Sequence, residues 1–163
     1  RSRTPLGGRH LASGRERDFR ARRERFEMAK ILENSSEYFY FVFRVFVGLL
    51  FAQHGAQKLF GMFTARPPVE LFSLFGLAGV IELFGGLAIA LGILTRLAAL
   101  AGAAEMVAAY FKVHVPRGPV PNENQGELAL LFLAAFLILI AHGSKIWGLE
   151  MLLFKKKTSY PEF

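Results

Sequence analysis

The chain has 163 residues, of which 53% are hydrophobic and 20% charged, and it contains no cysteine. This hydrophobic share is high for a soluble domain of such length and is typical of a small integral membrane protein. The lack of cysteine excludes disulfides, thiol chemistry, Cys-ligated iron–sulfur clusters and covalent c-type haem. The net charge of +7 arises mostly from an Arg-rich head, so we do not expect the chain to bind nucleic acid.

Residues 1–37 form a basic head in which Arg, Gly and Ser outnumber the large apolar side chains. Such a composition predicts disorder, because too little apolar surface is available to build a core. Met28 is the first methionine, and the stretch after it resembles the start of a membrane protein. We therefore expect residues 1–27 to be non-native sequence without function, and the first regular helix to begin near Glu37. The alternative is a basic arm that contacts anionic lipid headgroups.

Residues 38–150 are predicted to form an all-α domain, an integral membrane four-helix bundle. A helix needs about 20 predominantly apolar residues to cross a bilayer, and proline-rich or polar stretches separate four such runs. Small residues at helix-packing spacings favour close contact between the spans. We expect the spans at about 38–60, 70–94, 97–113 and 127–143.

Four spans place both termini on the same side of the membrane. That side carries more Lys and Arg than the other, even when the head is left out. The positive-inside rule then predicts a multi-pass protein of the cell (inner or plasma) membrane with both termini in the cytoplasm. Residues 151–163 would form a basic tail at the membrane interface.

The first span carries polar residues on one helical stripe: Arg44, His54 and Lys58. Ionisable groups within a membrane are costly and usually face protein or water. The second and third spans each carry one acid, Glu82 and Glu105, and we expect Arg44 to reach either of them. The cluster is interpreted either as a structural clamp that fixes helix register or as a site for protons or a ligand.

A second set of polar residues is expected at the outer end of the bundle. His54 and Lys58 end the first span, and His114 and Glu127 lie on either side of the last loop. No HxxxH or ExxH spacing occurs, so we expect no metal site. Two histidines on different helices are also what a bis-His haem requires. Each stands alone here, however, and haem is not expected.

Several short patterns occur together in a fixed order: Arg44-x3-Gly48, His54-Gly55-x2-Lys58, Glu82-x2-Gly85-Gly86, Thr95-Arg96, and His114 followed by Gly126-Glu127. In this combination the sequence resembles the DoxX family, with its DoxD-like relatives. The resemblance implies a small four-helix membrane protein associated with respiratory or redox chemistry. DoxD-like relatives are similar to subunits of a thiosulfate:quinone oxidoreductase, and many members have no established activity.

The resemblance favours a subunit of, or accessory to, a membrane redox complex with protein partners. Its bundle would bind a quinone or another small hydrophobic ligand, and whether the chain is an enzyme stays open. No side chain here carries electrons, so a bound cofactor or a partner would have to do so. The alternative is a non-catalytic scaffold or a small-molecule transporter, and a transporter is expected to show broken helices at mid-membrane.

Overall fold

The computed structural model describes residues 8–145 and 147–150, and these form helices and turns without a β-strand. The predicted all-α class is confirmed. The chain divides into two units between Phe39 and Tyr40, and helix α1 (Gly8–Phe60) runs through the division. The predicted tail at 151–163 lies outside the described residues.

The described part of the first unit is the N-terminal portion of α1. The expectation that the helix begins near Glu37 is wrong, because residues 8–37 are already helical. This segment is rich in Arg, Glu and Ala, which are good helix formers, and it contains no proline. Its side chains from Arg17 to Lys30 are exposed. The head therefore forms a helix without building a core in this stretch.

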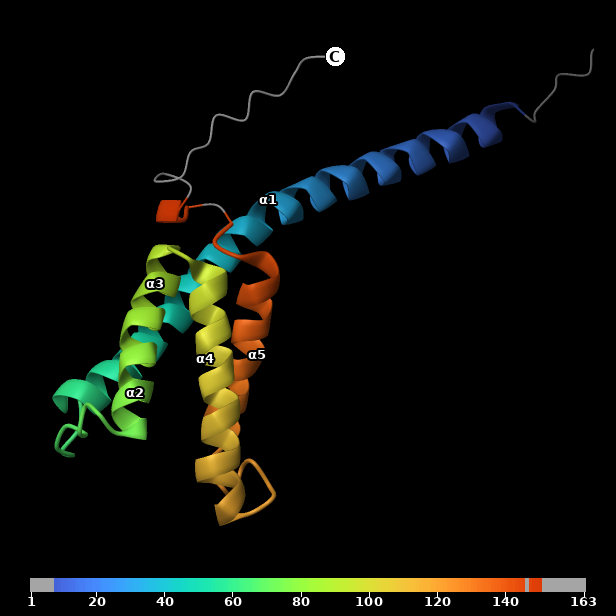
Figure 1. Cartoon of the computed structure of the whole chain (residues 1–163). Coiled ribbons are helices and arrows are strands. Elements are labelled where there is room, and N and C mark those ends of the chain that lie inside the picture. The colour runs from blue at the N-terminus through green and yellow to red at the C-terminus, as the bar shows by residue number, and fades with distance from the viewer. Residues whose placement is uncertain (1–7, 146, 151–163) are drawn as a thin grey trace, which may run out of the picture. The chain divides into compact units, whose positions relative to one another are not determined.

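The second unit contains four helical rods joined by short connections (Figure 1). The first is α1 from Tyr40 onward. The second rod consists of α2 (Leu74–Val80), η1 (Ile81–Gly85) and α3 (Gly86–Leu91) in continuous succession. The third consists of α4 (Thr95–Ala109), η2 (Tyr110–His114) and η3 (Val115–Arg117). The fourth is α5 (Glu127–His142). Both η1 and η2 are π-helical, whereas η3 is a 3-10 turn.

The second rod begins later than expected, at Leu74 rather than at Glu70. Ser73 has extended backbone angles, and its hydroxyl accepts a hydrogen bond from the backbone N–H of Gly76 at 3.0 Å. This is the arrangement of a helix N-cap. The rod ends at Gly92, whose φ of 72° is left-handed. The N–H groups of Gly92 and Ile93 bond back to the carbonyls of Ile89 and Ala88, as in a Schellman motif.

Close backbone contact joins α1 to the second rod. A Cβ atom added to Gly48 would lie 2.5 Å from the backbone nitrogen of Ala90. A Cβ atom added to Gly86 of the second rod would likewise collide with the backbone of Ala52 on α1. The two helices therefore approach through small residues, as the sequence pattern predicts.

The apolar core lies between α1, α3, α4 and α5, and α4 and α5 run side by side (Figure 1). Phe51 from α1 meets the ring of Phe136 edge-on, with centroids 4.7 Å apart. Gly102 of α4 lies directly against the Phe136 ring. This aromatic packing fixes the end of α1 that carries His54 and Lys58.

Two helices in the described ranges are long and apolar enough to cross a membrane, judged by length and composition. They are Arg17–Phe60, which includes the predicted span at about 38–60, and Leu74–Leu91, which lies within the predicted span at about 70–94. Helix α5 is apolar but shorter.

Candidate functional site

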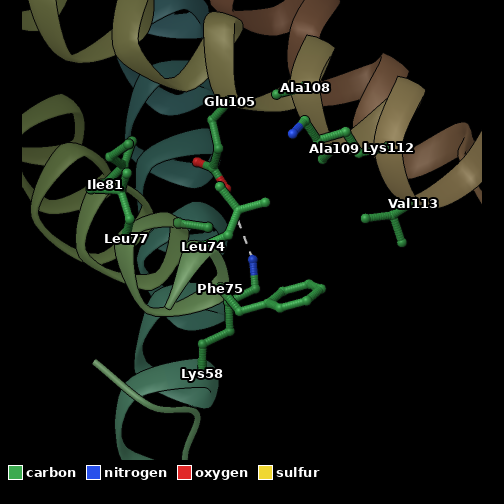
Figure 2. Close-up of a pocket in the computed structure, with 11 residues that line it drawn as sticks. Lys58, Leu74, Phe75, Leu77, Ile81, Glu105, Ala108, Ala109, Lys112 and Val113 are labelled. Carbon is green, nitrogen blue, oxygen red and sulfur yellow. Dashed lines mark ion pairs between the residues drawn. The ribbon is translucent and has the colours of Figure 1, made fainter. Parts of the chain in front are cut away.

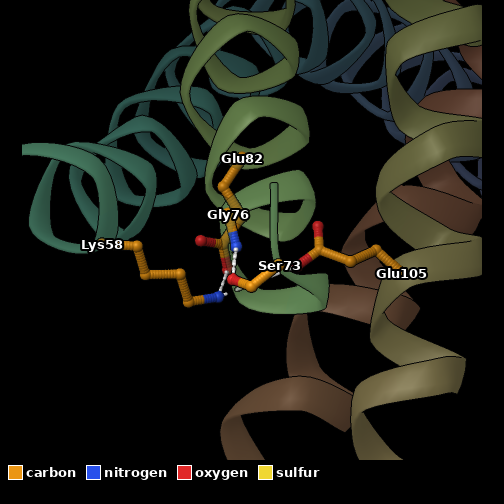
Figure 3. A network of polar contacts seen from close by, with 5 residues as sticks. All are labelled: Lys58, Ser73, Gly76, Glu82 and Glu105. Carbon is orange, nitrogen blue, oxygen red and sulfur yellow. Dashed lines mark hydrogen bonds and ion pairs between the residues drawn. The ribbon is translucent and has the colours of Figure 1, made fainter. Parts of the chain in front are cut away.

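Three charged side chains from three rods meet within the second unit. The Lys58 ammonium lies 3.8 Å from Oε1 of Glu105 on α4, and Figure 2 shows these side chains reaching toward each other. The Lys58 ammonium also donates a shorter hydrogen bond, 2.7 Å, to Oε1 of Glu82 in η1 (Figure 3). The carboxylates are buried, with side chains 5% and 8% exposed. We call Lys58, Glu82 and Glu105 the Lys58 cluster.

The local backbone explains why the Lys58 cluster can form. Glu82 lies in a π-helical turn, and such turns change the direction of side chains within an otherwise α-helical rod. Gly55 and Gly79 carry no side chain where α1 meets this rod. A Cβ on Gly79 would lie 3.2 Å from the Cβ of Lys58. The resulting close approach lets Lys58 reach an acid on the neighbouring rod.

The Lys58 cluster is not fully satisfied. Oε2 of Glu82 and Oε2 of Glu105 are buried and have no hydrogen-bond partner. A buried polar atom without a partner costs about 1–3 kcal/mol, and more when it is charged. Two carboxyl groups also face a single ammonium. Each acid therefore has one oxygen available to a proton, a water molecule or a ligand.

Two cavities adjoin the Lys58 cluster. The first, of about 220 Å³, is an apolar groove between α2 and α4 with Lys58, Glu105 and Lys112 among its lining residues (Figure 2). The second, of about 160 Å³, is a polar cavity bounded on one side by α5. Its lining residues are His54, Lys58, Glu82, Met106, Ala109, His114, Gln125, Leu128, Ala129 and Phe132. Lys58 lines both cavities.

His114 lies in the second π-helical turn, η2, and a buried loop residue holds its ring. Its Nδ1 is 3.0 Å from the backbone carbonyl of Asn124. Asn124 is fully buried, donates from its side chain to the carbonyl of Gly118, and accepts from the N–H of Gly126. A buried loop Asn leaves no periodic signal in the sequence, so the role of Asn124 could not be predicted from it.

Arg44 lies elsewhere, and its expected pairing with Glu82 or Glu105 is wrong. The guanidinium donates from Nη1 to the carbonyls of Ile89 and Ala90, at 2.6 and 2.9 Å, and from Nη2 to that of Trp147, at 3.2 Å. The C-terminal carbonyls of a helix carry partial negative charge. They give a buried cation an alternative to a carboxylate.

The comparisons with known proteins identify the family. A sequence model of DoxX matches residues 39–115. An uncharacterized protein of Haemophilus influenzae is 35% identical over an alignment 136 residues long, which covers 77% of this chain and 98% of the relative. The chain belongs to the DoxX family. No solved structure matches it.

Six of the seven sequence-predicted candidates fall within the range that matches DoxX. The structure brings His54, Lys58, Glu82 and His114 to the polar cavity and places Glu105 at the apolar groove. Arg44 lines neither the polar cavity nor the apolar groove. The seventh, Glu127, is exposed as the first residue of α5 and lines neither cavity.

The described residues of this DoxX chain contain no group of three or more His, Asp or Glu side chains placed to hold a metal ion. The nitrogen of His114 that faces Asn124 is engaged. The His54 ring packs edge-on against Phe132, with centroids 5.8 Å apart. The Lys, two Glu and two His side chains at this site can form hydrogen bonds and transfer protons.

Proposed function

We propose that this DoxX protein is embedded in a membrane by its four rods. Many large apolar side chains of the second unit are exposed, and such a surface is unfavourable in water. They lie on all four rods: Phe46, Leu49, Leu50, Phe84, Leu87, Leu97, Leu100, Leu131, Leu137 and Ile138. Hydrocarbon is the environment that suits them, because the helices satisfy their own backbone groups.

Both termini face the cytoplasm in this proposal, and the protein is multi-pass in the cell membrane. The absence of native cysteine makes the test direct. Arg66→Cys and Glu123→Cys should react with a membrane-impermeant maleimide in intact cells, whereas Lys30→Cys should react only after lysis. Labelling of Lys30→Cys in intact cells would overturn the orientation.

The Lys58 cluster is the centre of the proposed function: an accessory subunit of a membrane redox complex that binds a small hydrophobic ligand. The observation that carries this proposal is the pair of buried, unpartnered carboxylate oxygens on Glu82 and Glu105. They lie beside an apolar groove. Ionisable groups are retained at such depth in apolar helices chiefly where they act on ions, protons or ligands.

A quinone is the candidate ligand, and the residues present fit it. When bound, a quinone supplies electron and proton exchange, and a partner subunit or a further cofactor supplies the electrons. The chain's own groups have simpler roles. His54 offers a ring N–H donor. The Nδ1–H of His114 is engaged by the carbonyl of Asn124, so Nε2 of the neutral ring is an acceptor. Lys58 holds the two acids in place, and Glu82 and Glu105 take up and release protons.

Purification from native membranes tests this function. Wild-type protein in mild detergent should carry a lipophilic ligand and partner proteins, detected by mass spectrometry and optical spectra. Glu82→Gln should lose the ligand, and Glu127→Gln, outside both cavities, should keep it. A wild-type protein that is empty, spectrally silent and free of partners would overturn the redox role.

A scaffold without ligand chemistry is the second candidate, and Arg44 is the observation that favours it. Its bonds to three carbonyls join α1, the end of α3 and Trp147. A scaffold predicts that Glu82→Gln weakens partner assembly as much as Arg44→Met does. The ligand-site proposal predicts that Glu82→Gln leaves assembly intact.

A further inference from the structure

The apolar groove between α2 and α4 has a polar group buried at its wall. Leu74, Phe75, Leu77, Ala78, Ile81, Ala108, Ala109 and Val113 supply its apolar lining. Three charged residues complete it, namely Lys58, Glu105 and Lys112 (Figure 2). Glu105 approaches from α4 and Lys58 from α1, so the groove ends against the Lys58 cluster.

At this end of the groove, one buried oxygen of Glu105 has no hydrogen-bond partner. The Lys58 ammonium is already directed at Oε1 of Glu82 and Oε1 of Glu105. Oε2 of Glu105 has no partner, and its side chain is more than nine-tenths buried. A ligand that fills the groove therefore meets a free acceptor when Glu105 is ionised and a free O–H donor when Glu105 carries a proton. A hydroxyl group can pair with either form, because it both donates and accepts. A ligand whose polar atoms only accept hydrogen bonds would leave the ionised carboxylate oxygen unsatisfied.

We propose that the groove binds a lipophilic hydroxyl compound, such as a phenol, whose O–H donates to Oε2 of Glu105. Its apolar body would lie against the Leu and Phe side chains of α2. The inference rests on the ligand site proposed above and adds the chemical class of the ligand and the atom that selects it. For a quinone, it favours the hydroxyl-bearing reduced form over the form that only accepts hydrogen bonds.

An anionic amphiphile is the competing occupant, because Lys112 is exposed at the same groove. A head group held there would add negative charge beside a cluster in which two carboxyl groups share one ammonium. It would also leave Oε2 of Glu105 without a donor. A neutral hydroxyl compound satisfies that oxygen and adds no charge, so the structure favours it.

Binding of matched synthetic probes to the purified full chain in neutral detergent tests the inference. The probes are 4-octylphenol, its methyl ether, which has no donor, and octanoate, which is anionic. Equilibrium dialysis at alkaline pH, which favours the ionised form of Glu105, should show the phenol binding about tenfold more tightly than the ether, as expected when a buried acceptor is left unpaired. Equal binding of phenol and ether, or tighter binding of octanoate that Lys112→Gln abolishes, would overturn the inference.

Two variants locate the site. Glu105→Leu removes the acceptor and leaves Lys58 paired with Glu82, so the preference for phenol over ether should fall to about one. Ala108→Phe fills the groove and should weaken both probes about tenfold or more. Its matched control, Ala104→Phe, is exposed on the same helix and lines neither cavity, and it should leave binding unchanged. Retained discrimination in Glu105→Leu would overturn the assignment of the atom.

The binding test of the groove and the test of the redox role can fail independently of each other. Phenol-selective binding by a protein that purifies without partners would support the groove and overturn the redox role. A wild-type protein that carries partners and a native ligand, yet binds phenol no better than ether, would support the redox role and overturn the groove's selectivity.

Discussion

Lys58 and Glu82 form a 2.7 Å ion pair between rods, although 24 residues separate them in the chain. The acid is buried and the lysine is partly exposed, so the pair closes the end of the α1–η1 contact. Glu105 adds a second, longer contact from α4. This one ammonium therefore connects three of the four rods.

Removing the ammonium should be costly for stability. Lys58→Met leaves Glu82 and Glu105 without a cation, and breaking a buried pair from one side typically costs about 3–5 kcal/mol. Chemical denaturation in detergent micelles, followed by far-UV circular dichroism, measures this loss. Lys112→Met, at an exposed lysine of η2, is the matched control and should change the unfolding free energy by less than about 0.5 kcal/mol.

The two acids should couple unequally to Lys58. A double-mutant cycle on Lys58→Met and Glu82→Gln should give a coupling free energy of about 1–3 kcal/mol. The same cycle with Glu105→Gln should give a smaller value, because its contact is 3.8 Å rather than 2.7 Å. Equal coupling in the two cycles would contradict this ranking of the acids.

The sequence predicted the helices better than their contacts. Apolar runs and proline-rich breaks located α5 and the second rod to within a few residues, because burial and lipid exposure both favour such runs. The helical stripe also placed His54 and Lys58 on one inward face. Helical periodicity does not determine which rod that face meets. The sequence therefore predicts a carboxylate partner for Arg44, whereas the structure gives it backbone carbonyls.

Two further differences have local causes. The π-helical turn at Ile81–Gly85 brings Glu82 toward Lys58, and an α-helical projection of the sequence contains no such turn. The head has too few large apolar side chains to build a core, and such a composition favours disorder. Its helix-forming residues and the absence of proline after Pro5 instead continue α1 back to Gly8.

Arg44 should be a structural residue rather than a ligand-binding one. Arg44→Met leaves the carbonyls of Ile89, Ala90 and Trp147 without this donor and should lower the unfolding free energy by about 2–4 kcal/mol. Arg44→Lys should recover only part of that loss, because a single ammonium lacks the planar fork that reaches several carbonyls. Ligand binding by the folded fraction, measured by equilibrium dialysis, should equal that of the wild type. Loss of binding in a fully folded Arg44→Met protein would assign Arg44 to the ligand site instead.

Two adjacent glycines provide a test of how closely α1 and the second rod approach. A Cβ on Gly86 would meet the Gly48 carbonyl oxygen at 2.6 Å, so Gly86→Ala must push the rods apart. A Cβ on Gly85 would have its nearest neighbour, the Phe51 ring, at 3.8 Å, which is ordinary contact. Gly86→Ala should therefore destabilise the protein by about 2 kcal/mol or more, in the range of overpacked sites. Gly85→Ala should be neutral or stabilising by up to about 1 kcal/mol, because alanine favours helix more than glycine does. Thermal unfolding of both variants in the same detergent decides the point, and similar melting temperatures for the two would show that the rods do not approach each other as the structure has them.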